Sequence, residues 1–359
     1  MKFLTTFLFA LSIFSITNNT LAAEKLFNVV VTNPSSDQRA VAFVDTVTGK
    51  NRLVEVNMSG NVVWEWDMPS KLDTRNICKG ADINYLPSTD SFLFVLPKSG
   101  AYIVNRNGDY KTVVEDNQIT HDIDQLPNGN FIYTRGWVNK GEDEVREITP
   151  AGQLVWKWSH ASYFTNRERF LSSLPKKALK HGLRGTLKKD GVDWAHVNGV
   201  ERYPNGDTNI SMRNFFMFVI VAPDGIPKQT FKHIRLIHEP HRTDFGYIAA
   251  DRAMRRGVWK HAILKIEDDG STHKTLLPGQ FKTVRGIEQL PNKRYNITSS
   301  GNVFEMSSDG TIFQRMHLSI QSEDAERDLN ARQKLPKNTL SEGRCASKNL
   351  YKVAKTKTY

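Results

Sequence analysis

Short alternating segments and glycine turns follow one another along most of the chain. Polar and apolar residues alternate in residues 52–56 and 262–266, and this period of two is typical of a β-strand with one buried face. Each such segment runs into a turn that ends in glycine, and most turns lead into another alternating segment, such as residues 62–66 and 154–158. Two alternating strands joined by a glycine turn form a β-hairpin. The pattern therefore predicts a chain built from hairpins.

The hairpin turn recurs at a nearly constant interval. Its glycines are separated by 48, 44, 73, 45 and 40 residues, which is the length of one four-stranded blade of a β-propeller, with one long insertion in the fourth blade. The six glycines are Gly60, Gly108, Gly152, Gly225, Gly270 and Gly310. We predict an all-β fold, a six-bladed β-propeller of four-stranded blades over residues 23–320. Two equivalent tryptophan pairs, Trp64 with Trp66 and Trp156 with Trp158, are assigned to packing between blades.

A second turn, marked by proline, separates the first and second strands of most blades. The strand before it lines the central channel of a propeller, so residues at equal distances before the turn are expected to face one another across the axis. We count six residues back from each proline and, in the fifth blade, eight residues back from Gly246. The residues found in this way are predicted to face the axis. The set contains His121, Asn198, His238 and Arg285, with His196 two residues before Asn198 on the same strand face.

Three of the ten histidines of the chain fall in this axial set. Ligands of propellers bind at the axis, so the set predicts a functional site rather than isolated structural histidines. Neutral imidazole serves as nucleophile, as proton carrier or as metal ligand. The residues alone leave open a metal-dependent hydrolase or oxygenase with Asp122 and Asp193 as further ligands, and a propeller that binds an anion without catalysis. Arg285 beside a metal dication is unfavourable, and suits an anion better.

Residues 193–200 (Asp-Trp-Ala-His-Val-Asn-Gly-Val), with residues 204–207 and 211–214, resemble the hallmark of the bacterial arylsulfate sulfotransferase family. Residues 121–130 are similar to the preceding blade of that family, and residues 238–246 to its blade with the nucleophilic histidine. The resemblance extends over about residues 45–315. It implies a six-bladed periplasmic propeller that moves a sulfuryl group from a phenolic sulfate ester to a phenol acceptor, without a nucleotide sulfate donor (PAPS) and without a cofactor.

The resemblance also implies roles for individual residues. It implies a two-step mechanism through a sulfohistidine, with His238 as the nucleophile and His241 as a nearby competitor. We favour His238, because an extended strand turns a residue three positions on to the opposite face. The remaining implied catalytic and substrate-binding residues are His121, His196, Asn198 and Arg213, and the axial register adds Arg285 to the substrate-binding residues.

Charge and composition narrow the expected partners. The chain has 49 Lys and Arg against 38 Asp and Glu, a net charge of +11, and 39% apolar residues, which excludes a disordered chain. We expect no nucleic-acid partner, because the chain has no binding motif and starts with an export signal. We predict a basic insertion over about residues 159–193, and two roles for it stay open: a lid that closes over the channel mouth and attracts anionic aryl sulfates, or a solvated basic loop. The oligomeric state stays open, with a homodimer among the options.

The two ends of the chain carry further signals. Residues 1–22 have the charged, apolar and small-residue zones of a secretory signal peptide, and no later segment is long and apolar enough to anchor the chain in a membrane. We therefore predict a soluble, exported protein and favour the periplasm. Export exposes the only cysteines, Cys78 and Cys345, to an oxidising compartment, so we predict a disulfide between them that ties the C-terminal tail, residues 321–359, to the propeller.

Overall fold

The computed structural model of the chain describes residues 27–32, 39–45, 50–164, 193–235, 237–255, 258–270, 273–281, 284–290, 292–299, 302–320 and 353–358. The predicted signal peptide, residues 165–192 of the basic insertion and most of the C-terminal tail lie outside these residues. Cys345 lies outside them as well, so its pairing with Cys78 stays a prediction. No helix in the described ranges is long and apolar enough to cross a membrane.

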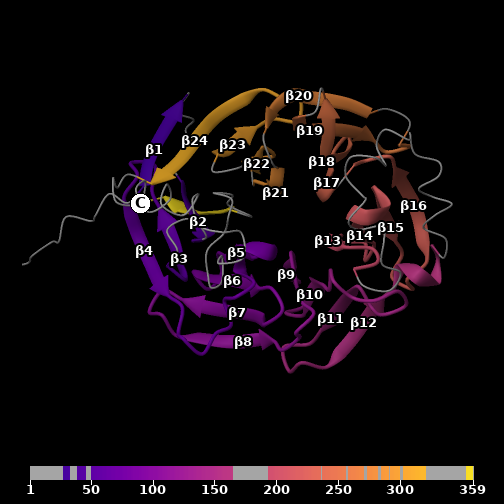
Figure 1. The fold of residues 1–359 in the computed structure, drawn as a ribbon, viewed down its shortest axis with the longest axis horizontal. Coiled ribbons are helices and arrows are strands. Elements are labelled where there is room, and N and C mark those ends of the chain that lie inside the picture. Colours follow the sequence, from indigo (N-terminus) through magenta and orange to yellow (C-terminus); the bar gives the residue numbers. More distant parts are fainter. Residues whose placement is uncertain are drawn as a thin grey trace, which may run out of the picture.

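Six antiparallel sheets stand around a common axis, as Figure 1 shows, which confirms the predicted six-bladed β-propeller. Five of the sheets have four strands, and the sixth has a fifth strand at its outer edge. From the axis outward, blade one has β25 (Val353–Thr358), β2 (Arg39–Val44), β3 (Arg52–Val56) and β4 (Val62–Asp67). In the same order, blade two has β5 (Asp82–Leu86), β6 (Ser91–Leu96), β7 (Gly100–Asn105) and β8 (Tyr110–Val114), and blade three has β9 (Ile123–Gln125), β10 (Phe131–Thr134), β11 (Val145–Ile148) and β12 (Leu154–Trp158).

The other three blades follow in chain order. Blade four has β13 (Val197–Arg202), β14 (Thr208–Met212), β15 (Met217–Val221) and β16 (Pro227–Lys232). Blade five has β17 (His238–Thr243), β18 (Gly246–Arg255), β19 (Val258–Glu267) and β20 (His273–Phe281). Blade six has β21 (Val284–Gln289), β22 (Tyr295–Ser299), β23 (Asn302–Met306) and β24 (Ile312–Ile320). Short 3-10 helices are η1 (Ile77–Lys79), η2 (His160–Ser162) and η3 (Arg213–Phe215).

The six glycines that set the repeat all occupy the turn between the third and fourth strands of a blade. All have positive φ angles, between 70° and 93°, a backbone conformation that glycine adopts without steric cost. In every copy the glycine N–H donates a hydrogen bond to the carbonyl of the residue three positions earlier, for example Gly108 to Asn105 at 3.1 Å and Gly225 to Ala222 at 2.9 Å. One turn geometry therefore explains the periodicity of the sequence.

Both ends of the described chain close the ring. β1 (Phe27–Thr32) pairs with β24 and adds a fifth, outermost strand to blade six. β25 pairs with β2 and supplies the innermost strand of blade one. The sequence places residues 353–358 in a tail packed on the propeller, whereas the structure assigns them to a blade. Residues more than 300 positions apart therefore pair in one sheet, as with Phe43 and Val353.

The tryptophan pairs connect neighbouring blades, as the sequence predicts. The indole N–H groups of Trp64 and Trp66 donate to the carbonyls of Arg106 and Gly108 in the outer turn of blade two, at 3.0 and 3.1 Å. Trp156 and Trp158 make the same pair of bonds to the outer turn of blade four, to Pro223 and Gly225, at 3.0 and 3.1 Å.

Close to the axis, carboxylate side chains link three pairs of neighbouring blades. Asp122 accepts a hydrogen bond from the Val200 N–H at 2.7 Å, and Asp82 does the same for Ile123 at 3.2 Å. Glu239 accepts from the Ile287 N–H at 3.0 Å. These carboxylates are buried, so each bond satisfies a backbone donor that water does not reach. These bonds hold the innermost strands of neighbouring blades together.

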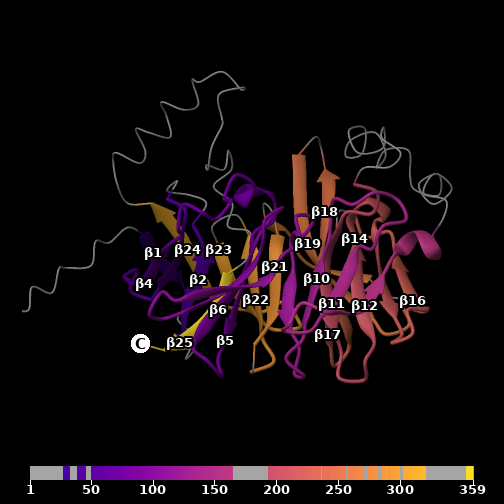
Figure 2. The same cartoon turned by 90° about the horizontal axis from the view of Figure 1, so that it is seen from below.

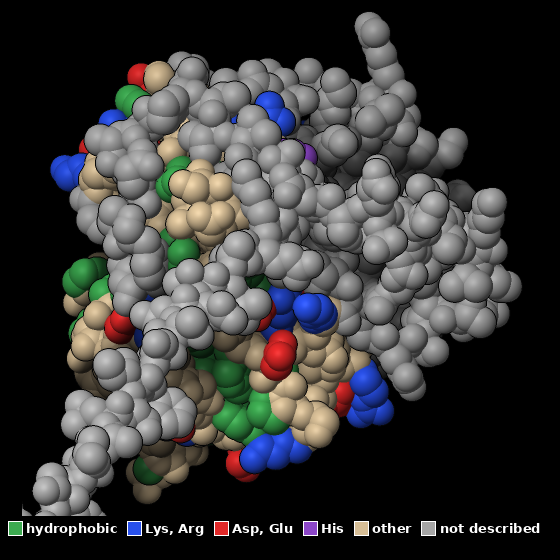
Figure 3. Space-filling model, turned by 90° about the vertical axis from the view of Figure 1, so that its left-hand side faces the viewer, with side chains coloured by type: hydrophobic (Ala, Val, Ile, Leu, Met, Phe, Trp, Pro, Cys, Tyr) green, Lys and Arg blue, Asp and Glu red, His purple; other side chains and the backbone are tan. Residues whose placement is uncertain are grey.

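One hairpin of blade five projects from the ring. Seen from the side, β18 and β19 extend beyond the neighbouring blades (Figure 2). Because His238 pairs with Ala250 and β18 continues to Arg255, His238 lies toward the side from which this hairpin projects. On the face shown in Figure 3, described basic and acidic side chains lie next to one another rather than in areas of one sign.

Candidate active site

The three axial histidines stand where the innermost strands of three successive blades begin. His121 lies two residues before β9, His196 one residue before β13, and His238 is the first residue of β17. His121 and His196 have positive φ angles of 69° and 51°, which are uncommon outside glycine and concentrate at functional sites. His196 and Asn198 were expected on the same strand face. That expectation was wrong, because His196 precedes the strand and a bulge separates Val197 from Gly199.

His121 and His196 contact each other directly. Their ring centroids are 4.9 Å apart and the rings meet edge to face at 66°. The His121 N–H donates to the Gly80 carbonyl at 2.9 Å, and its Nδ1 lies 2.6 Å from the Thr120 hydroxyl. A Cβ at Gly80 would lie 2.8 Å from the His121 ring. Only glycine therefore allows the imidazole to take this position.

A carboxylate orients His196. Its Nδ1 lies 2.7 Å from Asp193 Oδ1, so Nδ1 carries the proton and Nε2 keeps the free lone pair. The segment is held by Asn214, whose side chain donates to the Asp193 carbonyl at 2.8 Å and whose N–H donates to the Ala195 carbonyl at 3.0 Å. The Arg213 N–H donates to the His196 carbonyl at 3.2 Å. The predicted motif therefore folds into one compact unit.

Burial and two arginines keep both imidazoles neutral. Burial lowers the pKa of His121 well below 6.5, and the charges of His196, Arg285 and Arg213 lower it further. Burial likewise lowers the pKa of His196, followed by the charges of Arg213 and Arg285. A neutral imidazole has a lone pair for an electrophile or for a proton, and the arginines supply positive charge for an anion.

His238 is joined to this group through Arg285. Arg285 Nη1 lies 2.7 Å from His238 Nε2. A guanidinium only donates hydrogen bonds, so Nε2 is the unprotonated nitrogen and His238 is a neutral imidazole with its proton on Nδ1. His238 is buried, at 5% exposure. The structure thus brings His121, His196, Arg213, Arg285 and His238 to one mouth of the channel.

Both ends of the Asn198 side chain form hydrogen bonds within the protein. Its side-chain nitrogen donates to the Ile237 carbonyl at 2.9 Å, and its oxygen accepts from the Ser211 hydroxyl at 2.8 Å. Ile237 directly precedes His238, so Asn198 ties blade four to the backbone that carries this histidine. A direct contact between Asn198 and a substrate stays a prediction.

His241 lines a cavity that does not include His238. Its Nδ1 is 3.3 Å from Glu201 Oε1, and a bulge in β17 separates the two histidines. The cavity that His241 lines has a volume of about 440 Å³ and contains none of the axial histidines. Its acidic lining residues are Asp122, Asp124, Glu201, Glu239 and Glu288. Such a cavity disfavours an anionic ligand beside His241, whereas the guanidinium of Arg285 lies beside His238.

The two aspartates considered as metal ligands have other contacts. Asp122 accepts from the Val200 N–H, and Asp193 orients His196. Within the part of the chain that the structure describes, no group of three or more His, Cys, Asp or Glu side chains has the geometry of a metal site.

Trp137 was missed by the sequence analysis. Its ring meets those of His121 and His196 edge to face, with centroids 5.6 and 6.3 Å apart, and the ammonium of Lys98 lies 5.1 Å from its centroid. Trp137 lies between β10 and β11, outside every repeat signal, so no spacing in the sequence points to it.

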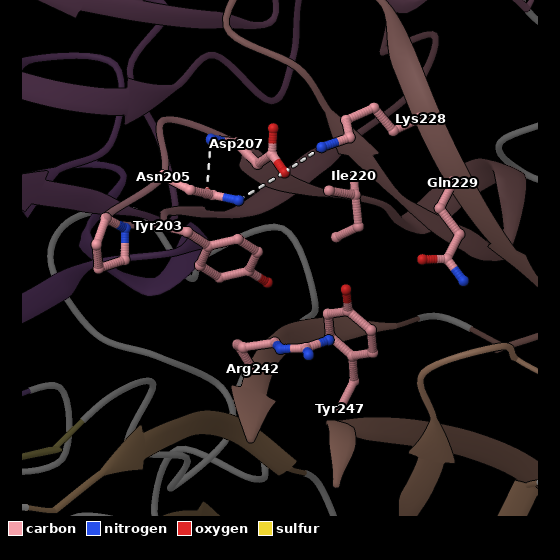
Figure 4. Close-up of a pocket in the computed structure, with 9 residues that line it drawn as sticks. Tyr203, Asn205, Asp207, Ile220, Lys228, Gln229, Arg242 and Tyr247 are labelled. Carbon is pink, nitrogen blue, oxygen red and sulfur yellow. Dashed lines mark hydrogen bonds and ion pairs between the residues drawn. The ribbon is translucent and has the colours of Figure 1, made fainter. Parts of the chain in front are cut away.

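A second cavity, of about 770 Å³, lies between blades four and five. The hydroxyl groups of Tyr203 and Tyr247 point into it (Figure 4). Its charged groups are paired within the protein, since Lys228 bonds Asp207 at 2.7 Å and Arg242 forms an ion pair with Asp268. None of the axial histidines lines this cavity, so we do not assign the reaction to it.

Part of the chain matches a known protein family. Residues 88–225 match the family model described as arylsulfotransferase (ASST), which confirms the resemblance seen in the sequence. This region includes His121, His196 and Arg213 and ends before His238. No curated protein matches the chain.

Solved structures resemble the chain in fold. A protein of unknown function from Bacteroides caccae is 12% identical, with a TM-score of 0.53 over 78% of this chain and 94% of that one. A catalytically inactive variant of virginiamycin B lyase from Staphylococcus aureus, with quinupristin, is 14% identical, with a TM-score of 0.46 over 80% of this chain and 87% of that one. At such identity, the first of these shows a common fold alone.

Proposed function

We propose that this chain, whose residues 88–225 match the arylsulfotransferase family model, transfers a sulfuryl group from a phenolic sulfate ester to a phenol through a sulfohistidine at His238. The observation that carries the proposal is one cluster of neutral imidazoles and arginines. His121 and His196 have lowered pKa values, and both lie in the field of Arg213 and Arg285. An aryl sulfate carries one negative charge spread over three oxygens, which this combination accommodates.

In the first step, the Nε2 lone pair of His238 attacks sulfur. The N–S bond forms, the bond from sulfur to the phenolic oxygen breaks, and a phenolate leaves. Arg285 exchanges its hydrogen bond to His238 Nε2 for one to a sulfuryl oxygen, so a single residue holds the nucleophile before binding and the charge during transfer. Arg213 stabilises the same oxygens as electron density moves onto them. Positioning and charge therefore do most of the catalysis, as in phosphoryl transfer.

In the second step, His196 acts as the base. Its free Nε2 accepts the proton of the acceptor phenol, whose oxygen attacks sulfur while the N–S bond breaks and His238 becomes neutral again. The imidazolium formed at His196 is stabilised by Asp193, 2.7 Å from Nδ1. Its proton returns, directly or through solvent, to the phenolate released from the donor. Proton transfer of this kind is worth about 10²–10⁴-fold in rate.

Release of nitrophenol from nitrophenyl sulfate, with and without added phenol, tests the proposal. We expect acceptor-dependent release in the wild type, its loss in His238→Ala, and its retention in His241→Ala, the matched control in the same strand. Release that a chelator abolishes would favour the metal-dependent alternative. No release with a broad set of phenols, from a folded protein that binds aryl sulfates, would overturn the proposal in favour of a non-catalytic anion-binding propeller.

We also propose that the protein acts after export, in the periplasm, with Cys78 and Cys345 joined. The apolar N-terminal segment and the two cysteines support this. N-terminal sequencing of the protein from the periplasmic fraction should start after residue 22, and non-reducing peptide mapping should recover the two cysteines in one linked species. Intact Met1 in a cytoplasmic fraction would contradict it.

A further inference from the structure

Trp137 lies beside the candidate site, in a loop held by backbone hydrogen bonds. The loop is fixed on both sides of it, since the Arg135 N–H donates to the Glu144 carbonyl at 2.7 Å and the Trp194 N–H donates to the Val138 carbonyl at 3.3 Å. A Cβ at Gly136 would lie 2.6 Å from the Thr120 side chain and 2.8 Å from the Val197 carbonyl. The glycine thus lets the loop approach the axis closely enough for the indole to reach the histidines.

Lys98 lies next to Trp137, on the neighbouring blade. It lies between β6 and β7 of blade two, and its N–H donates to the Ile119 carbonyl at 2.9 Å. Its side chain is exposed, and its ammonium lies 5.1 Å from the Trp137 centroid, within the range of a cation–π contact. Indole and ammonium therefore come from adjacent blades and meet beside His121.

The geometry of sulfuryl transfer to His238 places the aryl group of the substrate toward Trp137 and Lys98. In an in-line displacement the leaving oxygen lies on the far side of sulfur from the nucleophile. His238 begins the innermost strand of blade five, and blade two faces blade five across the axis in the six-bladed ring (Figure 1). A phenolic oxygen opposite His238 therefore points toward blades two and three, where Lys98 and Trp137 stand.

We infer that Trp137 and Lys98 form the aryl-binding subsite, and that Lys98 makes the site select phenols with an anionic ring substituent such as a carboxylate. This inference rests on the proposed function. The indole supplies an apolar, polarisable surface for a phenyl ring, while the ammonium offers charge to a substituent at the far end of the ring. A neutral phenol gains only the first of these interactions.

Transfer from nitrophenyl sulfate to two acceptors of matched shape, 4-hydroxybenzoate and 4-hydroxybenzamide, tests the selectivity. We expect the wild type to have the higher kcat/KM with the benzoate. Lys98→Gln should lower kcat/KM for the benzoate roughly two- to fivefold more than for the benzamide, as expected of an exposed ion pair. Trp137→Leu should lower both by about tenfold. Lys140→Gln is the matched control, because the Lys140 ammonium lies over Trp194, 4.6 Å from its centroid, and it should leave the ratio unchanged.

An unchanged benzoate-to-benzamide ratio in Lys98→Gln, with transfer intact, would overturn the inference and leave the proposed function standing. Calorimetric binding of 4-hydroxybenzoate gives a second measurement that needs no turnover. Weaker binding in Lys98→Gln and Trp137→Leu supports the subsite even in a protein that transfers nothing. Equal binding in wild type and both variants overturns it.

Discussion

The carboxylate of Asp193 offers the sharpest test of how the site handles protons. It lies 2.7 Å from His196 Nδ1, and the residue has a φ of 58°. Asparagine has nearly the same shape and tolerates this backbone conformation. The bond from Asn214 goes to the Asp193 backbone carbonyl, so Asp193→Asn leaves it in place. The substitution therefore removes one negative charge with little change in structure.

The expected loss of rate in Asp193→Asn follows from the positive charge that His196 acquires in the second step. When His196 takes the proton of the acceptor, its hydrogen bond to Asp193 becomes one between two charged groups. The side chains of His196 and Asp193 are 11% and 22% exposed, so water replaces the carboxylate poorly. A hydrogen bond to a charged group contributes about 1.5–3 kcal/mol, which corresponds to roughly 10- to 100-fold in the rate of the second step.

Rapid mixing with nitrophenyl sulfate separates the two steps. We expect Asp193→Asn to keep the initial burst of nitrophenol, because His238 still takes the sulfuryl group, and to turn over roughly 10- to 100-fold more slowly with acceptor present. Asp224→Asn, at the exposed outer turn of blade four, is the control and should behave as wild type. Wild-type turnover in a folded Asp193→Asn protein, or loss of the burst, would refute the assignment of His196 as base.

Three further predictions concern pH and stability. Because the active form of His196 is neutral and its pKa is lowered below 6.5, kcat/KM should be full at pH 6.5 and fall only at lower pH; a pH–rate profile with its acid limb at or above 6.5 would contradict this. Gly80→Ala should displace His121 and lower both activity and melting temperature. Gly152→Ala is the control, because Gly152 has a φ of 80° but nothing lies within 4 Å of an added Cβ, and it should lower the free energy of unfolding by only about 1 kcal/mol. Equal losses of stability in the two variants would refute the steric argument. Asp122→Ala leaves the buried Val200 N–H without its acceptor and should destabilise the fold by about 1–3 kcal/mol in urea unfolding, and an unchanged midpoint would show that the link between blades contributes nothing.

Most of the fold could be predicted from the repeated glycine turn. One local geometry recurs at each glycine turn, from Gly60 to Gly310, so a sequence spacing translated directly into a blade count. Closure of the ring had no such local signal. β25 pairs with β2, and β1 pairs with β24, across almost the whole length of the chain, and the period-two pattern of a short strand does not say which distant strand it joins.

The candidate site was also predictable from the sequence only in part. His121 and His238 follow from their distance to the first turn of a blade, because innermost strands share a register. The details that set the chemistry depend on tertiary contacts between blades: the left-handed backbone at His196, the donation from Arg285 to His238, and the approach of Trp137. The Arg285–His238 contact joins blades six and five, the Trp137–His196 contact joins blades three and four, and none of the three details has a signal in the repeat.

The central claim is that His238 carries the sulfuryl group, and mass spectrometry of the intermediate tests it most directly. The protein is mixed with nitrophenyl sulfate in the absence of acceptor, quenched at alkaline pH and digested after arginine, which yields residues 236–242 with both His238 and His241 in one peptide. The account predicts the added mass of one SO₃ group, placed on His238 by fragmentation and lost when phenol is added before the quench. An SO₃ group on His241, or none on either histidine while turnover proceeds, would contradict the account.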